Sequence, residues 1–259
     1  MEPERASTLW MPGMTVWRLA SIALFCGLWE IAGQIPINAA FPPFSETVVA
    51  FARMTADGSL PVAYLITMQP LVIGLIISAT VGVSVGVLIG MRRSAEWLIA
   101  PIFIVLQAAP VAALIPLVTF VYGIGLTAKT MAVCLLALPV IVLNSYKAIR
   151  NVNPSLVAMC RSFLGTPQQR IVKIMLPDAA PLIFAGLRLG VSAGFIGVVL
   201  AELLITPTGI GDLITFHRST ASYPEMYATI ASIVLFSALT LAVLQWVEVR
   251  LFRPEKRGA

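Results

Sequence analysis

Residues 123–130, Gly-Ile-Gly-Leu-Thr-Ala-Lys-Thr, are the part of this chain that comes closest to a known chemical motif. In a phosphate-binding loop, G-x-x-x-x-G-K-[ST], backbone N–H groups cradle the phosphates and the lysine reaches the terminal ones. Here Ala128 replaces the second glycine. The motif also requires a preceding β-strand, whereas this segment follows a long apolar run. We interpret it as a tight turn, and the sequence holds no recognisable nucleotide site.

Two acidic residues, Glu30 and Glu202, lie near the ends of apolar runs. Carboxylates at membrane depth are usually functional, although desolvating them costs less close to an interface. We therefore expect each to make an anchoring or gate-side hydrogen bond rather than to relay protons. The segment Thr208-Gly209-Ile210-Gly211 is rich in turn formers and is expected to cap the outer mouth of a bundle. Glu202, Gly209 and Gly211 are gate candidates.

Other residues suited to catalysis or metal binding are sparse. Cys26, Cys134 and Cys160 stand at no metal-ligand spacing, and His217 is the only histidine. No Ser/His/Asp, Cys/His or paired-carboxylate arrangement falls in one accessible place. We expect no enzymatic activity, no metal, no cofactor and no disulfide.

The composition is that of a membrane protein. The 259 residues are 59% hydrophobic and 11% charged, whereas soluble domains carry about 25% charged residues. Six apolar runs approach or exceed the roughly 20 residues that cross a bilayer core. Because backbone amides cannot stay unpaired in hydrocarbon, and the runs lack the alternation of a β-barrel, they should be helices. The sequence predicts one all-α integral membrane domain with six transmembrane helices, over residues 17–35, 62–91, 97–122, 129–146, 181–205 and 226–249.

The chain has a net charge of +5, and its basic residues are unevenly distributed between the two sides of the membrane. With the N-terminus inside, thirteen Lys and Arg residues fall in inner segments, and only Arg53, Lys129 and Arg218 fall outside. This positive-inside bias predicts cytoplasmic termini and argues against nucleic-acid binding. It gives a cytoplasmic tail over 1–16, a transmembrane domain over 17–250 and a basic cytoplasmic tail over 251–259. The first run has features of a secretory signal, but it is long for one, and an uncleaved span is favoured.

Small residues and prolines distinguish individual spans. Pro101, Pro110 and Pro116 each remove a backbone donor from the third span, which predicts a kinked helix. Broken backbone at membrane depth is tolerated where it is buried or lines a cavity, so Gln107, Pro110 and Pro116 are pathway candidates, although kinks that only shape a bundle are about as common. Small residues at four-residue spacing predict close helix packing, inside the bundle or across a dimer seam. They are Gly74, Ser78, Gly82, Gly86 and Gly90 in the second span and Gly186, Gly190 and Gly194 in the fifth.

A basic segment, residues 147–178, interrupts the apolar runs on the inner side. Asn153-Pro154 is a helix-start signal and Gly165 a stop, which predicts a helix over 155–164. Leu156, Met159, Cys160 and Phe163 recur on it at helical spacing. Thr166-Pro167 predicts a second helix through Met175 that ends at Leu176-Pro177. Two helices tethered between spans fit a knob for the groove of a cytoplasmic partner better than a DNA-binding unit.

Several of these segments resemble one family. Ile174-x-Leu176-Pro177 is similar to the end of the cytoplasmic motif E-A-A-x3-G-x9-I-x-L-P of permease subunits of ATP-binding-cassette importers, the nitrate/sulfonate/taurine group in particular. The run 110–116, the turn 122–125, Ala201-Glu202-Leu203-Leu204 and the segment 208–211 also resemble that group. The motif's Glu and Gly are absent, because Ala158 and Leu164 occupy their positions. The coupling residues that the resemblance implies are Ala158, Met159, Cys160, Arg161, Ser162, Phe163, Leu164, Gly165, Ile174, Leu176 and Pro177.

The resemblance implies a type I importer permease in the bacterial inner membrane. Its expected partners are two cytoplasmic ATP-binding subunits, a second permease copy that is identical or non-identical, and a periplasmic or lipid-anchored solute-binding protein. The solute would be sulfonate-, taurine- or nitrate-like, or another small organic molecule. A passive channel and a membrane-embedded enzyme are the alternatives, but neither a filter-like sequence nor convergent titratable groups favours them.

Overall fold

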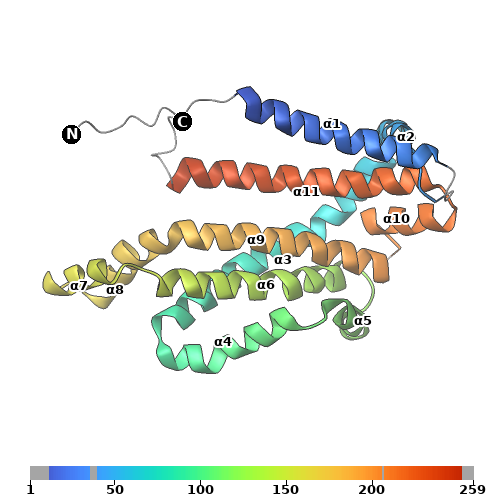
Figure 1. The fold of residues 1–259 in the computed structure, drawn as a ribbon. Helices are drawn as coiled ribbons and strands as arrows, with labels where there is room; N and C mark the ends of the chain where they lie inside the picture. The colour runs from blue at the N-terminus through green and yellow to red at the C-terminus, as the bar shows by residue number, and fades with distance from the viewer. Residues whose placement is uncertain (1–11, 36–39, 206, 253–259) are drawn as a thin grey trace.

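The computed structural model describes residues 12–35, 40–205 and 207–252, and these residues form helices and no β-strand (Figure 1). The all-α prediction is confirmed. The helices are α1 (Pro12–Gln34), α2 (Phe44–Ala56), α3 (Ser59–Met91), α4 (Arg93–Ala108), α5 (Val111–Tyr122), α6 (Leu126–Arg150), α7 (Pro154–Ser162), α8 (Pro167–Arg170), α9 (Leu176–Leu204), α10 (Ile210–Ser219) and α11 (Tyr223–Phe252), with a π-helical turn (Ile171–Met175) between α8 and α9. The outermost residues of both predicted tails lie outside the described residues.

Four helices of the described chain are long and apolar enough to cross a membrane by length and composition. They are α3, α6, α11 and the continuous helix Pro167–Leu204. α4 and α5 meet the same criterion only as a pair, and the first predicted span falls on α1, whose apolar part Leu19–Gln34 is shorter. Each predicted span thus coincides with a helix or a helix pair, but the number of clear spans is four, or five with the bent pair.

α6 forms the centre of the bundle, packed between α3 and α9 (Figure 1). On α3, a Cβ added to Gly82 would lie 2.8 Å from the Ile141 side chain. On α9, a Cβ added to Gly186 would lie 2.6 Å from Asn144 Cβ, and Gly190 contacts Ile141 from that side. The side chain of Ile141 therefore fits between two glycines, and both neighbouring backbones approach α6 closely. Of the predicted glycines, those that face α6 in this way are Gly74, Gly82, Gly86 and Gly90 of α3 and Gly186 and Gly190 of α9, while Gly194 meets both Leu75 of α3 and Val133 of α6.

The third predicted span is two helices rather than one kinked helix. The chain turns by 103° between α4 and α5. Ala109 is extended there (φ −65°, ψ 142°), as expected for a residue that precedes a proline. Pro101 and Pro116 lie within α4 and α5 and do not end them. The prediction of a single helix over 97–122 is therefore wrong, and the break falls at Pro110.

We expected the second helix of the basic segment to end at Leu176-Pro177, and this prediction is wrong. The helix continues from Pro167 to Leu204. Pro177 has no N–H and its ring crowds the preceding turn of an α-helix. The π-helical turn Ile171–Met175 widens that turn, and the Leu176 N–H bonds to the Ile171 carbonyl five residues back. The chain therefore accommodates Pro177 without breaking the helix.

The two ends of the bundle carry different elements (Figure 1). α7 and α8 project at one end, which also holds the C-terminal end of α11, whereas α2, α5 and α10 lie at the opposite end. At that opposite end, Glu30 of α1 accepts hydrogen bonds from the Ser45 N–H at 2.8 Å and the Ser45 hydroxyl at 3.0 Å. The carboxylate thereby anchors the first turn of α2, in agreement with the anchoring role expected for Glu30.

Candidate functional site

The basic segment is held firmly at its base. The Asn153 side-chain oxygen accepts from the Ser155 N–H at 2.9 Å and caps α7, with Pro154 at the first helical position. The Asn153 N–H donates to Asp178 Oδ2 at 3.1 Å, which joins α7 to the start of α9. Thr166 and Gln169 form a reciprocal capping box on α8. These bonds make the segment an ordered projection.

The tip of the basic segment, Phe163 and Leu164, is apolar and unpartnered. The two residues are 80% and 90% exposed. Large apolar side chains that project together into solvent mark an interaction site. The predicted stripe on α7 is divided, because Met159 is exposed and Cys160 is buried under Gly165. Of the other coupling candidates, the exposed ones are Ala158, Arg161, Ser162 and Pro177, and the half-buried ones are Ile174 and Leu176.

Leu164 has a left-handed backbone conformation, with φ +53°. It occupies the glycine position of the cytoplasmic motif E-A-A-x3-G-x9-I-x-L-P. For a residue with a Cβ, this conformation costs roughly 1 kcal/mol of folding free energy. We expect Leu164→Gly to raise the apparent melting temperature of the purified protein by about 2–4 °C. Leu164→Ala is the matched control, because it shortens the same exposed side chain but keeps the Cβ. Equal melting temperatures for the two variants would contradict this assignment of strain.

At the opposite end, four side chains form a polar cluster: the buried Thr67 of α3, Lys129 of α6 and Glu202 of α9, and the exposed Thr208. Lys129 Nζ lies 2.9 Å from Glu202 Oε1, and the two side chains are 4% and 0% exposed. The ammonium also donates to the Thr208 carbonyl at 2.9 Å and hydroxyl at 3.0 Å, so all three of its donors are used. The pair is therefore both neutralised and hydrogen-bonded, as a buried charge requires.

Backbone groups of the turn 207–211 complete the polar cluster. The Gly211 N–H donates to Glu202 Oε2 at 3.1 Å, and the Ile210 N–H donates to Thr67 Oγ1 at 3.0 Å. Gly209 has φ +95°, and a Cβ there would lie 2.5 Å from the Glu202 carboxyl carbon. A Cβ on Gly211 would lie 2.5 Å from Glu202 Cβ. The two glycines thus allow the turn to close around the carboxylate, and the structure brings together the gate candidates Glu202, Gly209 and Gly211.

Lys129 was not among the predicted site residues. We expected it at the outer border of the fourth span, and it lies in the first turns of α6 with its side chain buried. Its amine is engaged by Glu202 and Thr208, so it is not available for a phosphate. Gly123 and Gly125 have φ +77° and +140° and form the turn before α6. The opposite charges of Lys129 and Glu202 at the same ends of two spans were the available signal for their pairing.

The other pathway candidates stand apart from the cluster. Gln107 of α4, Pro110 between the two helices and Pro116 of α5 are all exposed. A second ion pair joins Arg188 Nη1 of α9 to Glu248 Oε2 of α11 at 3.2 Å. At the end that bears α7, Glu96 of α4 pairs with Arg150 of α6. These pairs brace neighbouring helices against one another.

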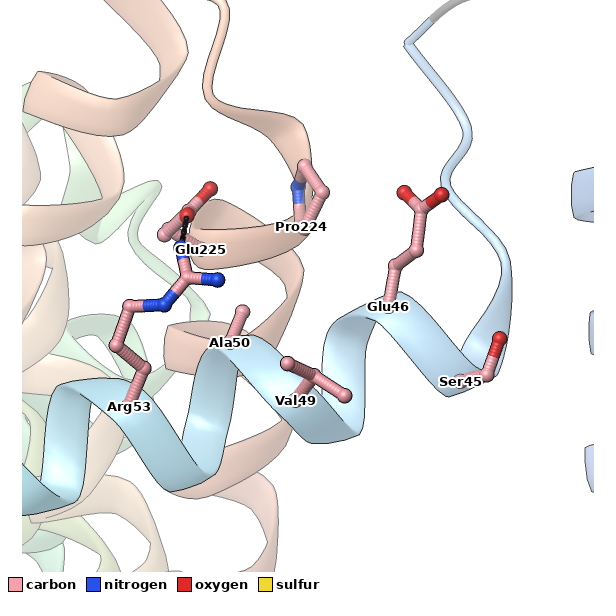
Figure 2. Close-up of a pocket in the computed structure, with 7 residues that line it drawn as sticks. All are labelled: Ser45, Glu46, Val49, Ala50, Arg53, Pro224 and Glu225. Carbon is pink, nitrogen blue, oxygen red and sulfur yellow. Dashed lines mark hydrogen bonds and ion pairs between the residues drawn. The ribbon is translucent and has the colours of Figure 1, made fainter.

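A cleft of about 320 Å³ lies between α2 and the start of α11 (Figure 2). Arg53 reaches across it to Glu225, with Nη1 and Oε1 3.5 Å apart. Glu46 and Val49 line the same cleft. The Arg53 side chain is 67% exposed, so this pair is solvated and worth at most about 1 kcal/mol. It contrasts with the desolvated pair of the polar cluster.

Within the described ranges, no group of three or more His, Cys, Asp or Glu side chains is placed to hold a metal ion. The arrangement is instead that of a helical bundle with an apolar projection at one end and a closed polar cluster at the other. It offers a partner surface and a mechanical connection between the two ends.

Proteins with similar sequences are named as permeases of solute-transport systems. The chain is 25% identical over 254 residues to the protein named as an aliphatic sulfonates transport permease, SsuC, of Bacillus subtilis (strain 168), which covers 97% of this chain and 90% of the relative. It is also 25% identical over 203 residues to the nitrate import permease protein NrtB of Synechococcus elongatus, covering 74% and 73%.

Among solved structures, the crystal structure of an amino acid ABC transporter with histidines matches with a TM-score of 0.59 at 18% identity, covering 78% of this chain and 98% of that one. At this identity the match supports the fold alone. The family model for the binding-protein-dependent transport system inner membrane component matches residues 79–253. Those residues run from the C-terminal part of α3 through α11 and include the whole basic segment and the polar cluster except Thr67. They make up more than half of the chain, and the chain therefore belongs to the family of inner-membrane components of binding-protein-dependent transport systems.

Proposed function

We propose that this chain forms the translocation pathway of an ATP-driven importer and contains no motor of its own. Two cytoplasmic ATP-binding subunits dock on the tip, and their closure on ATP turns the bundle from inward- to outward-facing. The observation that carries this proposal is the exposed tip, Phe163 and Leu164, on a segment fastened by the Asn153–Asp178 bond. An ordered apolar projection in a chain without a recognisable nucleotide motif implies an external partner.

The tip then defines the cytoplasmic side, and both termini lie there, as the positive-inside bias predicts. A second permease copy completes the pathway, identical or non-identical to this one. A solute-binding protein, as the family description implies, delivers the solute to the end that bears α10. The names of the relatives favour a small anion such as a sulfonate or nitrate.

Purification and reconstitution test this function. The tagged chain, extracted from its own host in mild detergent, should co-purify with an ATP-binding subunit. In proteoliposomes, the complex with its binding protein should accumulate taurine, an alkanesulfonate or nitrate only when ATP is present on the side of the basic segment. The chain alone should show no solute flux. Solute flux without ATP or partners would instead establish the passive channel, and isolation without any nucleotide-hydrolysing subunit would overturn the proposal.

A further inference from the structure

The polar cluster joins parts of the chain that are far apart in sequence. Three helices contribute one side chain each to this cluster: Thr67, Lys129 and Glu202. Each of these side chains hydrogen-bonds to the turn 207–211. We propose that these three residues are positioning residues of the outer gate, a latch that holds the turn and α10 against the ends of α3 and α6. That this turn gates a solute pathway rests on the proposed function. Whether the three residues hold the turn in place is tested separately, by the rate of cysteine modification.

The shape of the turn is the first argument for a latch. Only a residue without a Cβ fits at Gly209, because of both its φ of +95° and the Glu202 carboxyl group that lies against it. Gly211 is limited in the same way by the Glu202 backbone and Cβ. The turn is thus built around one carboxylate, which holds it from α9 while Lys129 holds Thr208 from α6.

The second argument is the position of the turn at the surface. Pro207, Thr208 and Gly209 form one wall of a cleft of about 500 Å³, whose other wall includes Asp57 and Ser59 at the start of α3. The Ser59 side chain and N–H stabilise the Asp57 carboxylate and lower its pKa, so this wall is charged at neutral pH. Any movement of the turn changes the width of this opening, and the latch determines where the turn rests.

The third argument is the role of the Thr67 hydroxyl. It donates to the Glu202 carboxylate, 2.9 Å from Oε2, and accepts from the Ile210 N–H at 3.0 Å. It therefore bridges α9 and the turn without carrying a charge. Removing it weakens the latch and leaves the buried ion pair intact, so this position separates positioning of the turn from the cost of an unpaired buried charge.

The rate of cysteine modification at Ile210 tests the latch. Ile210 is 1% exposed, so Ile210→Cys should react slowly with a membrane-impermeant maleimide applied from outside the cell. The assay uses the full chain in its complex, with Cys26, Cys134 and Cys160 replaced by alanine. Thr67→Val should raise this rate about tenfold, the equivalent of one hydrogen bond to a charged group, and Thr67→Ser should leave it unchanged.

Two controls accompany this comparison. Phe216 on α10 is 55% exposed, so the rate at which maleimide modifies Phe216→Cys should not depend on residue 67. Glu225→Gln removes the exposed pair of Figure 2 and should leave the Ile210→Cys rate unchanged. Glu202→Gln should increase the rate more than Thr67→Val does. If that variant fails to fold, the Thr67→Val and Thr67→Ser pair still decides the question.

ATP-driven uptake by the same variants links the latch to the gate. We expect Thr67→Val to lower uptake about tenfold at an unchanged amount of assembled complex, and Thr67→Ser to restore it. Equal maleimide rates for valine and serine at residue 67 would overturn the latch. A raised rate with unchanged uptake would overturn its role in the gate. Absence of ATP-driven uptake in the unmutated complex would instead contradict the proposed function, whatever the cysteine rates.

Discussion

Phe163→Asp is expected to abolish ATP-driven uptake while the bundle still folds. Phe163 is 80% exposed and packs against little of its own chain, so the change costs the isolated subunit almost nothing. In the assembled transporter the same residue would bring an unpaired carboxylate into an apolar groove. Loss of such an anchor typically costs about 2 kcal/mol or more, which corresponds to at least about a 30-fold weaker interaction.

The measurement is uptake and ATP hydrolysis by the complex in proteoliposomes, together with the amount of ATP-binding subunit that co-purifies. Arg161→Glu, which reverses an exposed charge next to the tip, should act in the same direction. Gln168→Asp is the matched control, because it adds the same charge to an exposed residue of α8. Full coupled uptake by Phe163→Asp would show that the tip does not contact the ATP-binding subunits.

Gly86→Leu is expected to prevent assembly of the bundle. A Cβ at this position of α3 would lie 2.6 Å from Ser145 Cβ and 2.6 Å from the Val142 carbonyl oxygen of α6. The carbonyl belongs to the backbone of the central helix and cannot move aside, so α3 must separate from α6. We expect a loss of more than about 3 kcal/mol in the free energy of unfolding. The yield of monodisperse protein in detergent and its melting temperature report this change.

Gly27→Leu provides the comparison for that substitution. It makes the same chemical change in α1, where nothing lies within 4 Å of an added Cβ. It should give a normal yield, since a leucine side chain there meets no neighbouring helix. If both variants were equally damaging, the loss would reflect glycine replacement in general, and the close contact of α3 with α6 would not be its cause.

The helices of this fold were predictable because lipid imposes a simple rule on the sequence. Long apolar runs must satisfy their own backbone hydrogen bonds, so their lengths and borders predict α3, α6, α9 and α11 closely. The four-residue spacing of glycine on α3 also predicts a face for close packing. The start of α7 followed from Asn153-Pro154, since a cap and a proline act within one turn.

The features that depend on distant contacts or on local backbone adjustment were not predictable in this way. Lys129 and Glu202 are 73 residues apart, and nothing local to either residue identifies the other as its partner. Pro101 and Pro116 lie inside α4 and α5, yet only Pro110 separates two helices, because whether a helix bends or breaks depends on what its neighbours allow. Pro177 was expected to end a helix, but the π-helical turn before it makes room for the proline ring, and the helix continues.

The unbroken helix Pro167–Leu204 has a mechanical consequence. Its 38 residues, at about 1.5 Å each, form a rod about 57 Å long with the tip next to its first residue and Glu202 near its last. A tilt of only about 5° about one end would carry the other end about 5 Å sideways, roughly the pitch of one helical turn. A small movement at the end that bears the basic segment would therefore become a displacement of about one helical turn at the end that bears the polar cluster.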